Sequence, residues 1–328
     1  MVKLHSILEK QLQQLQFSIE RLKSILALLA ENINTAEKQV TIMSKIRDYG
    51  QFMKLRLTSL VVFSAAIGFV IGSAGPLDWT KMLLLILGGV LVTGSSNGFN
   101  QIMEKNLDKL MERTQNRPLP QERMSVNESF LLASLMGIAG IIILWIFMNP
   151  VSGILGMLAL ILYTVVYTPL KRVTPFAVFV GAFPGAIPPM LGCVAATSGF
   201  GEIKLDAWLI FVGQFMWQFP HFWAIAWVLD EDYKKAGFHM LPSLGGRDKS
   251  SAFQILVYTL FLLPISLLPV LFGLSGIVSA IVISACGVFF SYQAYNLYKQ
   301  CTVEAARKLM FGSFIYLPLV QLAVMIGK

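Results

Sequence analysis

The sequence contains few charged residues for its length. Only 13% of its 328 residues are Asp, Glu, Lys or Arg, whereas 55% are hydrophobic. Soluble domains carry about 25% charged residues, so this composition excludes an ordinary water-facing surface over most of the chain. A surface that faces lipid needs almost no charge, and the mean hydropathy of +0.67 agrees with that environment. The chain is therefore predicted to be an integral membrane protein.

Cysteine and histidine are also scarce. The three cysteines lie far apart, at positions 193, 286 and 301, so they indicate neither a disulfide framework nor a zinc site. Of the three histidines, only His221 falls within a long apolar segment. The first 50 residues contain no apolar stretch of the kind that marks a cleavable signal peptide. Acidic, basic and phenolic side chains are therefore the first candidates for carrying function.

Long apolar segments make up most of the chain. A membrane-spanning helix needs about 20 apolar residues, and nine segments meet that need, at about residues 57–75, 82–103, 129–148, 151–169, 174–197, 206–229, 252–273, 276–297 and 309–327. Ser125 and Glu128 have the spacing of a capping box directly before the third segment. The sequence therefore predicts an all-α polytopic membrane protein with about nine transmembrane helices.

The basic residues are unevenly distributed between the two sides of the predicted membrane. If the loops are assigned alternately to the two sides, all of the 26 lysines and arginines except Lys81, Lys204 and Lys328 lie on one side. Such a bias marks the cytoplasmic side, which places the N-terminus in the cytoplasm and the C-terminus outside. Topology thus explains the net charge of +8, and no nucleic-acid partner is expected.

Residues 1–42 differ from the rest of the chain. Leucine and isoleucine recur there at alternating spacings of four and three residues, at Leu8, Leu12, Leu15, Ile19, Leu22, Leu26 and Leu29. This pattern is typical of a short coiled coil or an amphipathic helix. We expect a helical extension at 1–42 and a nine-helix domain at 43–328. The alternative is that translation begins at Met43, and neither interpretation gives the extension a chemical role.

Three polar residues recur at four-residue intervals where the second predicted span ends. Asn100, Glu104 and Asp108 would project from nearly one face of a helix. Carboxylates at the C-terminal end of a helix are unfavourably placed in the helix dipole, so a cationic partner is expected. Two carboxylates and an amide suit Mg²⁺, which prefers oxygen ligands and often bridges to substrate phosphate. A solvated turn at the interface is the simpler alternative.

Two arginines follow these acidic residues directly. Arg113 and Arg117 would be spaced by one helical turn if the helix continued. Guanidinium groups bind phosphate oxygens in a bidentate manner. Lipid headgroups are the competing explanation for both arginines.

The fourth predicted span ends in a stripe of phenolic and basic residues. Tyr163, Tyr167 and Lys171 recur at four-residue intervals, and Arg172 follows. Two phenols and an ammonium group at this face suit a diphosphate. Tyrosine and lysine are equally typical interfacial anchors of membrane helices, and the stripe by itself favours that interpretation.

A second acidic cluster follows the sixth predicted span. Asp230, Glu231 and Asp232 lie at the same membrane face as the first cluster. Two carboxylate clusters near one diphosphate suggest two or more metal ions that neutralise a departing pyrophosphate. His221 lies within the span itself, where an ionisable residue is a functional candidate. A hydrogen-bonded structural histidine is the alternative.

Three ordered motifs resemble the intramembrane prenyltransferases of the UbiA superfamily, over about residues 43–328. The stretch from Asn100, which ends in Met-x-Arg-Thr-x-x-Arg-Pro, resembles the first motif of the superfamily and the branch that farnesylates protoheme. The stretch from Tyr163 resembles the Tyr/Lys motif after the fourth helix, and the Pro-His-Phe-Trp sequence around His221 is similar to the second region of the same branch. Two departures are that Glu104 replaces the usual Asp and that the second region lacks a repeated Asp-x3-Asp.

The resemblance implies an all-α fold with about nine helices around a central cavity that opens to the cytoplasmic face. It also implies a Mg²⁺-dependent site, to which four groups of residues are assigned. The metal ligands would be Asn100, Glu104, Asp108 and Asp232, the catalytic residues Asp108, Asp232 and Lys171, the phosphate ligands Arg113, Arg117, Lys171 and Arg172, and the other substrate contacts Tyr163, Tyr167 and His221.

The reaction implied by the resemblance joins the farnesyl group of farnesyl diphosphate to the 2-vinyl group of protoheme IX (heme B). Water then adds, and the products are heme O and diphosphate. The expected setting is a bacterial inner membrane, with membrane lipids, a heme A synthase or a terminal oxidase assembly as partners. A quinone precursor or a chlorophyllide is the alternative acceptor. A heme-related transporter or an assembly scaffold is the alternative that is not an enzyme.

Overall fold

The computed structural model describes residues 20, 21, 23, 24 and 42–328. The predicted leucine repeat therefore lies outside the described residues. The chain divides into two compact units, residues 1–47 and 48–328, and helix α2 (Ile42–Phe52) crosses the boundary between them. The predicted boundary after residue 42 stays a prediction, and the second unit is the one described below.

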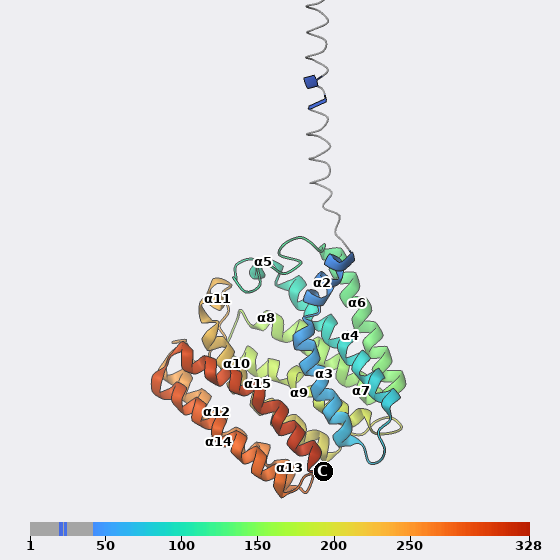
Figure 1. Cartoon of the computed structure of the whole chain (residues 1–328), viewed down its shortest axis with the longest axis vertical. Coiled ribbons are helices and arrows are strands. Elements are labelled where there is room, and N and C mark those ends of the chain that lie inside the picture. Colours follow the sequence, from blue (N-terminus) through green and yellow to red (C-terminus); the bar gives the residue numbers. More distant parts are fainter. Residues whose placement is uncertain (1–19, 22, 25–41) are drawn as a thin grey trace, which may run out of the picture. The chain divides into compact units, whose positions relative to one another are not determined.

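Residues 48–328 form an all-α bundle, as the sequence predicts (Figure 1). After α2, the helices are α3 (Leu55–Gly72), α4 (Trp79–Met103), α5 (Lys105–Asp108), α6 (Val126–Ile143), α7 (Pro150–Ile161), α8 (Thr168–Leu170), α9 (Ala177–Ala195), α10 (Leu205–Val228), α11 (Asp230–Lys235), α12 (Lys249–Ser266), α13 (Leu268–Leu271), α14 (Ile277–Gln300) and α15 (Val303–Ile326). Two short π-helical segments, Leu144–Met148 and Leu162–Tyr167, continue α6 and α7.

Eight helical segments in the described part of the chain are long and apolar enough to cross a membrane. They correspond to all of the nine predicted spans except residues 206–229. That ninth segment forms α10, which has 24 residues, but Gln214, Gln218 and His221 reduce its hydropathy. All three of these side chains are buried, so α10, like α4, carries polar groups into the interior.

Polar side chains begin several helices, because they accept hydrogen bonds from backbone N–H groups that have no partner within the helix. Ser125 accepts from the backbone N–H of Glu128 at 3.1 Å, which confirms the predicted cap before α6. Asn149 caps α7 in the same way, through Ser152. Such caps fix where each helix starts and so fix the register of the residues that it carries.

Helices α3 and α9 approach so closely that their backbones touch. A Cβ atom on Gly68 would lie 2.1 Å from the carbonyl oxygen of Pro189, and one on Gly192 would lie 2.0 Å from that of Ala65. Small residues permit such contacts between membrane helices, where packing drives association. This contact fixes α9 against α3 in the interior of the bundle.

The short helices mark one end of the bundle. Figure 1 shows α5, α8 and α11 at one end, with α13 and the C-terminus at the opposite end. We call the first of these the polar end, since the loops there carry the acidic and basic residues singled out in the sequence. The long helices below it present apolar side chains to one another and to the outer surface.

Candidate active site

A cavity of about 430 Å³ extends from the polar end into the bundle. Its walls come mainly from α3, α4, α9, α10 and α15, and most of its lining is apolar. The charged and phenolic side chains of the lining gather at one end, together with Asn100, and these residues are Lys54, Asn100, Glu104, Asp108, Arg113, Arg117, Tyr163, Tyr167, Lys171 and Tyr233. The cavity thus joins a charged head region to an apolar body.

The predicted polar stripe on α4 is formed, although the helix is interrupted within it. Asn100 lies in α4, Glu104 follows its last residue, and Asp108 ends the one-turn helix α5. Backbone hydrogen bonds from Glu104 to Asn100 (3.0 Å) and from Asp108 to Glu104 (2.8 Å) bridge the interruption. All three side chains are buried and line the cavity, so the structure brings these three predicted metal ligands together.

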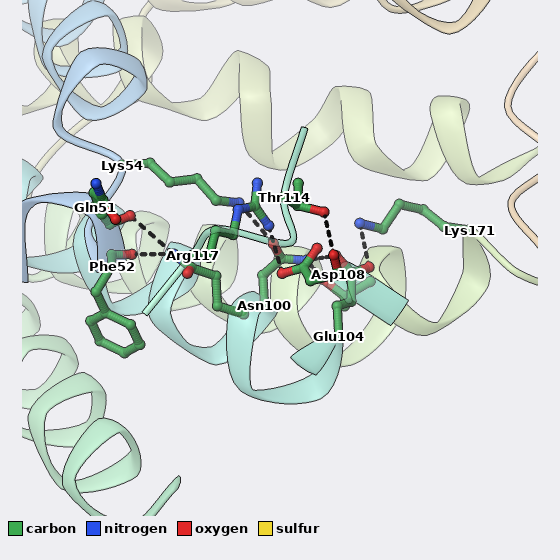
Figure 2. Close-up of polar contacts among 11 residues, drawn as sticks. Gln51, Phe52, Lys54, Asn100, Glu104, Asp108, Thr114, Arg117 and Lys171 are labelled. Atoms are coloured by element: carbon green, nitrogen blue, oxygen red, sulfur yellow. Dashed lines mark hydrogen bonds and ion pairs between the residues drawn. The ribbon is translucent and has the colours of Figure 1, made fainter. Parts of the chain in front are cut away.

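Each group of the stripe has a cationic partner from elsewhere in the sequence (Figure 2). Glu104 Oε1 lies 2.5 Å from Lys171 Nζ, and Asp108 Oδ2 lies 2.7 Å from Arg117 Nη1. Lys54 Nζ donates to Asn100 Oδ1 at 2.8 Å. Figure 2 shows the two lysines reaching the stripe from opposite sides. The cations that the helix dipole argument requires are therefore present.

The donor set of the stripe fits Mg²⁺. Asn100 Nδ2 donates to Glu104 Oε2 at 2.8 Å, so the amide oxygen, which accepts from Lys54 Nζ, is the atom that Asn100 offers to a metal. Asp108 is fully buried, and its Oδ1 atom has no hydrogen-bond partner. A buried carboxylate oxygen without a donor is costly unless a cation coordinates it. Within the described residues, however, no three His, Cys, Asp or Glu side chains are already gathered as a metal site.

Lys54 is one of the site residues that sequence reasoning missed, and Tyr233 is another. Lys54 lies between α2 and α3 with a left-handed backbone (φ 51°), a conformation that is uncommon outside glycine and asparagine. Burial, and then the nearby Arg117 and Lys171, lower the pKa of Lys54 well below its usual value. A lysine just before a membrane span is typical of an interfacial anchor, so no signal in the sequence distinguished it.

The tyrosine stripe is placed by a π-helical turn, a feature that often occurs at functional sites. At the end of this turn, Thr168 Oγ1 donates to the carbonyl oxygen of Tyr163 at 2.8 Å. The next residue, Pro169, has no backbone N–H to donate. The Tyr163 and Tyr167 rings lie 5.3 Å apart, and Lys171 Nζ lies 5.1 Å from the centre of the Tyr167 ring. The predicted stripe therefore faces the cavity as a unit.

The loop after α5 carries the two arginines. The helix does not continue through them, so the conditional one-turn spacing is not realised. Arg117 turns back to Asp108, whereas Arg113 lines the cavity without an ion pair to the stripe. Arg172, by contrast, is exposed and lies outside the cavity lining. Its assignment as a phosphate ligand stays a prediction.

The second acidic cluster does not join the stripe. Burial by itself would raise the pKa of Asp232. Hydrogen bonds from the backbone N–H groups of Arg113 and Glu112 outweigh this effect of burial, so the pKa lies below its usual value. Asp230 pairs with Lys234 at 2.8 Å. Neither carboxylate lines the cavity, and Asp232 holds the loop that carries Arg113. Its role as a metal ligand stays a prediction.

These features define a polytopic α-helical membrane protein whose charged groups surround the mouth of an intramembrane cavity. The chain belongs to the UbiA prenyltransferase family, whose model matches residues 61–315. It is 49% identical to the protoheme IX farnesyltransferase of Cytophaga hutchinsonii, over 87% of this chain and 99% of that protein. It is 47% identical to the protoheme IX farnesyltransferase of Christiangramia forsetii, over 87% of this chain and 94% of that protein.

Solved structures share the fold at lower identity. A structure of digeranylgeranylglyceryl phosphate synthase matches with a TM-score of 0.72 and 22% identity, over 87% of this chain and 98% of that one. The UbiA homolog of Archaeoglobus fulgidus bound to GPP and Mg²⁺ matches with a TM-score of 0.67 and 15% identity, over 84% of this chain and 99% of that one. These matches confirm the predicted UbiA-like helical fold.

Proposed function

We propose that this protein is a protoheme IX farnesyltransferase that makes heme O from protoheme IX and farnesyl diphosphate. The observation that carries the proposal is the cavity, in which an acidic stripe flanked by cations stands at the head of a long apolar body. An isoprenoid diphosphate has the same division into a charged head and an apolar chain. The farnesyltransferases to which the chain is 47–49% identical support the choice of substrates.

Asn100, Glu104 and Asp108 would hold Mg²⁺ through their oxygen atoms, with Asp232 as a further predicted ligand. When bound, Mg²⁺ neutralises charge on the diphosphate and so makes it a better leaving group. Lys54, Lys171, Arg113 and Arg117 surround this position, and all but Arg113 already contact the stripe. Once a diphosphate is present, Lys54, Lys171 and Arg117 would exchange a carboxylate or amide partner for phosphate oxygen.

The apolar body of the cavity serves the bond-breaking step. The C1–O bond of farnesyl diphosphate breaks, diphosphate leaves with the electron pair, and an allylic cation remains. The phenol rings of Tyr163 and Tyr167 stand beside the charged head, where aromatic faces stabilise a cation. Water would capture this cation prematurely, so the apolar wall protects it until the acceptor reacts.

The acceptor then attacks the cation. The 2-vinyl group of protoheme IX forms a carbon–carbon bond to C1, which leaves a positive charge on the carbon next to the porphyrin. Water adds there and loses a proton, so the product carries a hydroxyl group and the farnesyl chain. One water and two substrates thus yield heme O, diphosphate and a proton.

We infer that the cavity also opens towards lipid between α3 and α15. Leu60 and Phe63 on α3 and Phe314 on α15 line the cavity and are 49%, 40% and 41% exposed. Their exposed surface would face lipid. An isoprenoid chain dissolved in the membrane therefore has an apolar route into the cavity, as an enzyme with membrane-borne substrates requires.

The orientation and the partners belong to the proposal as well. The distribution of basic residues supports an active site on the cytoplasmic side, and the bacterial relatives support a bacterial inner membrane. Heme O would pass to a heme A synthase or a terminal oxidase. A quinone precursor or a chlorophyllide is the alternative acceptor. A transporter or scaffold for heme is the alternative without chemistry, and it leaves the buried acidic stripe without a purpose.

The test uses the full chain purified in detergent with farnesyl diphosphate, protoheme IX and Mg²⁺, followed by mass spectrometry of the extracted heme. We expect heme O, its loss on addition of a chelator and its return with excess Mg²⁺. Parallel reactions contain 4-hydroxybenzoate or chlorophyllide in place of heme. Prenylation of one of those acceptors, with none of heme, would replace the proposal, and no prenylated product from any acceptor would favour a transporter or scaffold.

A further inference from the structure

His221 lies at a point of the cavity that the diphosphate chemistry does not use. It is on α10, eight residues before Leu229 at the polar end, which corresponds to a depth of about 12 Å along the helix. The side chain is only 7% exposed and lines the apolar body of the cavity. Its environment therefore differs from that of the charged head.

One nitrogen of this ring has a partner that fixes its protonation. Nδ1 of His221 lies 2.7 Å from Oγ of Ser313 on α15. The Ser313 hydroxyl donates its single hydrogen to the carbonyl oxygen of Met310 at 2.5 Å. Ser313 Oγ can then only accept from the ring, so Nδ1 carries the hydrogen. In this neutral imidazole the free lone pair is on Nε2.

Nε2 makes no hydrogen bond to the described residues, and it is not among their fully buried unpaired polar atoms, so its lone pair faces the cavity. The ring is also held in place on both sides. Trp217 stacks on it at 4.2 Å and 17°, and Phe314 meets it edge-on at 4.9 Å and 81°. The indole of Trp217 donates to the backbone of Ser313 at 3.0 Å, which ties the same residues together.

We propose that Nε2 of His221 coordinates the iron of the heme substrate and that Ser313 is the positioning residue that holds the ring in the required tautomer. This inference rests on the proposed function, since it assumes that heme is the acceptor. Ligating histidines usually donate their other N–H group to a fixed partner, and Ser313 with Met310 supplies one here. A contact to a heme propionate would instead need a charged imidazolium, which the surrounding aromatic rings disfavour.

Iron coordination at this depth would orient the porphyrin for the reaction. The iron would lie in the apolar body, below the diphosphate, so the edge of the porphyrin would face the charged head. One edge of the porphyrin would then lie near C1 of the farnesyl chain. A single axial bond lets the porphyrin rotate, so His221 sets the depth and the face of the heme, and the cavity walls select the edge that carries the reacting vinyl group.

The first experiment titrates heme into the purified full-length protein and records its absorption and electron paramagnetic resonance spectra. We expect the wild type to show a histidine-coordinated heme. H221A should lose that signature, and added imidazole should restore it. H221M should replace it with the spectrum of thioether coordination. The control is H239A, because His239 is exposed on a loop and lies outside the cavity, and its spectrum should match the wild type.

The second experiment tests Ser313. S313A leaves Nδ1 without its acceptor, so heme affinity should fall by about 10–100-fold, the usual effect of losing such a partner. S313T keeps the hydroxyl and should restore affinity and spectrum. A purely structural role for Ser313 would alter protein yield without changing the coordination signature.

The two proposals fail in different ways. Unchanged histidine coordination in folded H221A, or thioether bands absent from folded H221M, would overturn the iron assignment whether or not heme O is made. A wild type with His221-dependent coordination that forms no heme O would instead overturn the proposed reaction and leave the iron assignment standing.

Discussion

At the scale of single residues, burial and pairing separate the acidic groups at the polar end. Asp108 is fully buried, faces the cavity and pairs with Arg117 at 2.7 Å. Asp48 is equally buried and pairs with Arg123 at 2.9 Å, but it lies outside the cavity lining. Each has one carboxylate oxygen without a hydrogen-bond partner. The two aspartates therefore form a matched pair for experiment.

Asp108→Asn should reduce heme O formation by at least about 100-fold, because removing one group that stabilises developing charge commonly has an effect of that size. Asp48→Asn breaks a similar buried ion pair, so it should lower thermal stability while leaving most of the turnover per folded protein. The measurement is the initial rate for each variant, normalised to the monodisperse fraction. Near-normal turnover in folded Asp108→Asn would remove Asp108 from the metal assignment.

Lys54→Met should raise the KM for farnesyl diphosphate by about 10–100-fold, since a hydrogen bond from a charged donor contributes about 1.5–3 kcal/mol. The expected effect on the KM for heme is small, because Lys54 stands at the charged head of the cavity. Arg56→Met is the control, because Arg56 is exposed two residues later. Equal KM changes in both variants would indicate a general effect of surface charge.

At the scale of elements, backbone contact between helices sets the shape of the cavity. α3 and α9 both line the cavity, and glycines at their crossing leave no room for a side chain. On α10, in contrast, Gly213 has open space where a Cβ atom would lie. Identical substitutions at these places should therefore have opposite effects.

Gly68→Ala should lower the unfolding free energy by at least about 1–3 kcal/mol, which is the usual cost of forcing extra volume into a packed interior. The loss can be larger because the new Cβ atom would meet the backbone of Pro189, which cannot move aside as a side chain can. Gly213→Ala should raise it by about 0.5–1 kcal/mol, since alanine favours the helix. Thermal unfolding in one detergent compares the two. A Gly68→Ala variant as stable as the wild type would contradict the close contact.

Asp248 caps α12 and provides a test of pH dependence. Its pKa is lowered by hydrogen bonds from the Ser243 hydroxyl and the Ser251 backbone N–H. A lowered pKa in the folded state means that the cap stabilises the protein above the unfolded pKa of about 3.9 and loses this effect as the pH falls. Asp248→Ala should therefore cost about 1 kcal/mol at pH 7. The deficit should shrink in unfolding measurements below pH 4, and a deficit independent of pH would contradict the assignment.

At the scale of the whole molecule, the polar end and the C-terminus mark opposite ends of the bundle (Figure 1). Two cysteine variants probe the two ends. Leu244 is fully exposed between α11 and α12, and Gly75 lies between α3 and α4. In intact cells without the native cysteines, a membrane-impermeant maleimide should label Gly75→Cys but not Leu244→Cys. The reverse pattern would place the active site outside the cytoplasm.

The sequence by itself determined the membrane-spanning all-α fold, because lipid demands long apolar helices whose backbone groups are paired internally. It also determined the stripe of Asn100, Glu104 and Asp108, since four-residue spacing is a local property of a helix. Only the tertiary structure decided what these residues meet. Lys54 and Lys171 reach the stripe from distant segments, and Asp232 binds a loop backbone instead of the cavity. The tautomer of His221 depends on Ser313, which is 92 residues away. Such pairings follow from helix packing across the bundle, and no local pattern in the sequence encodes them.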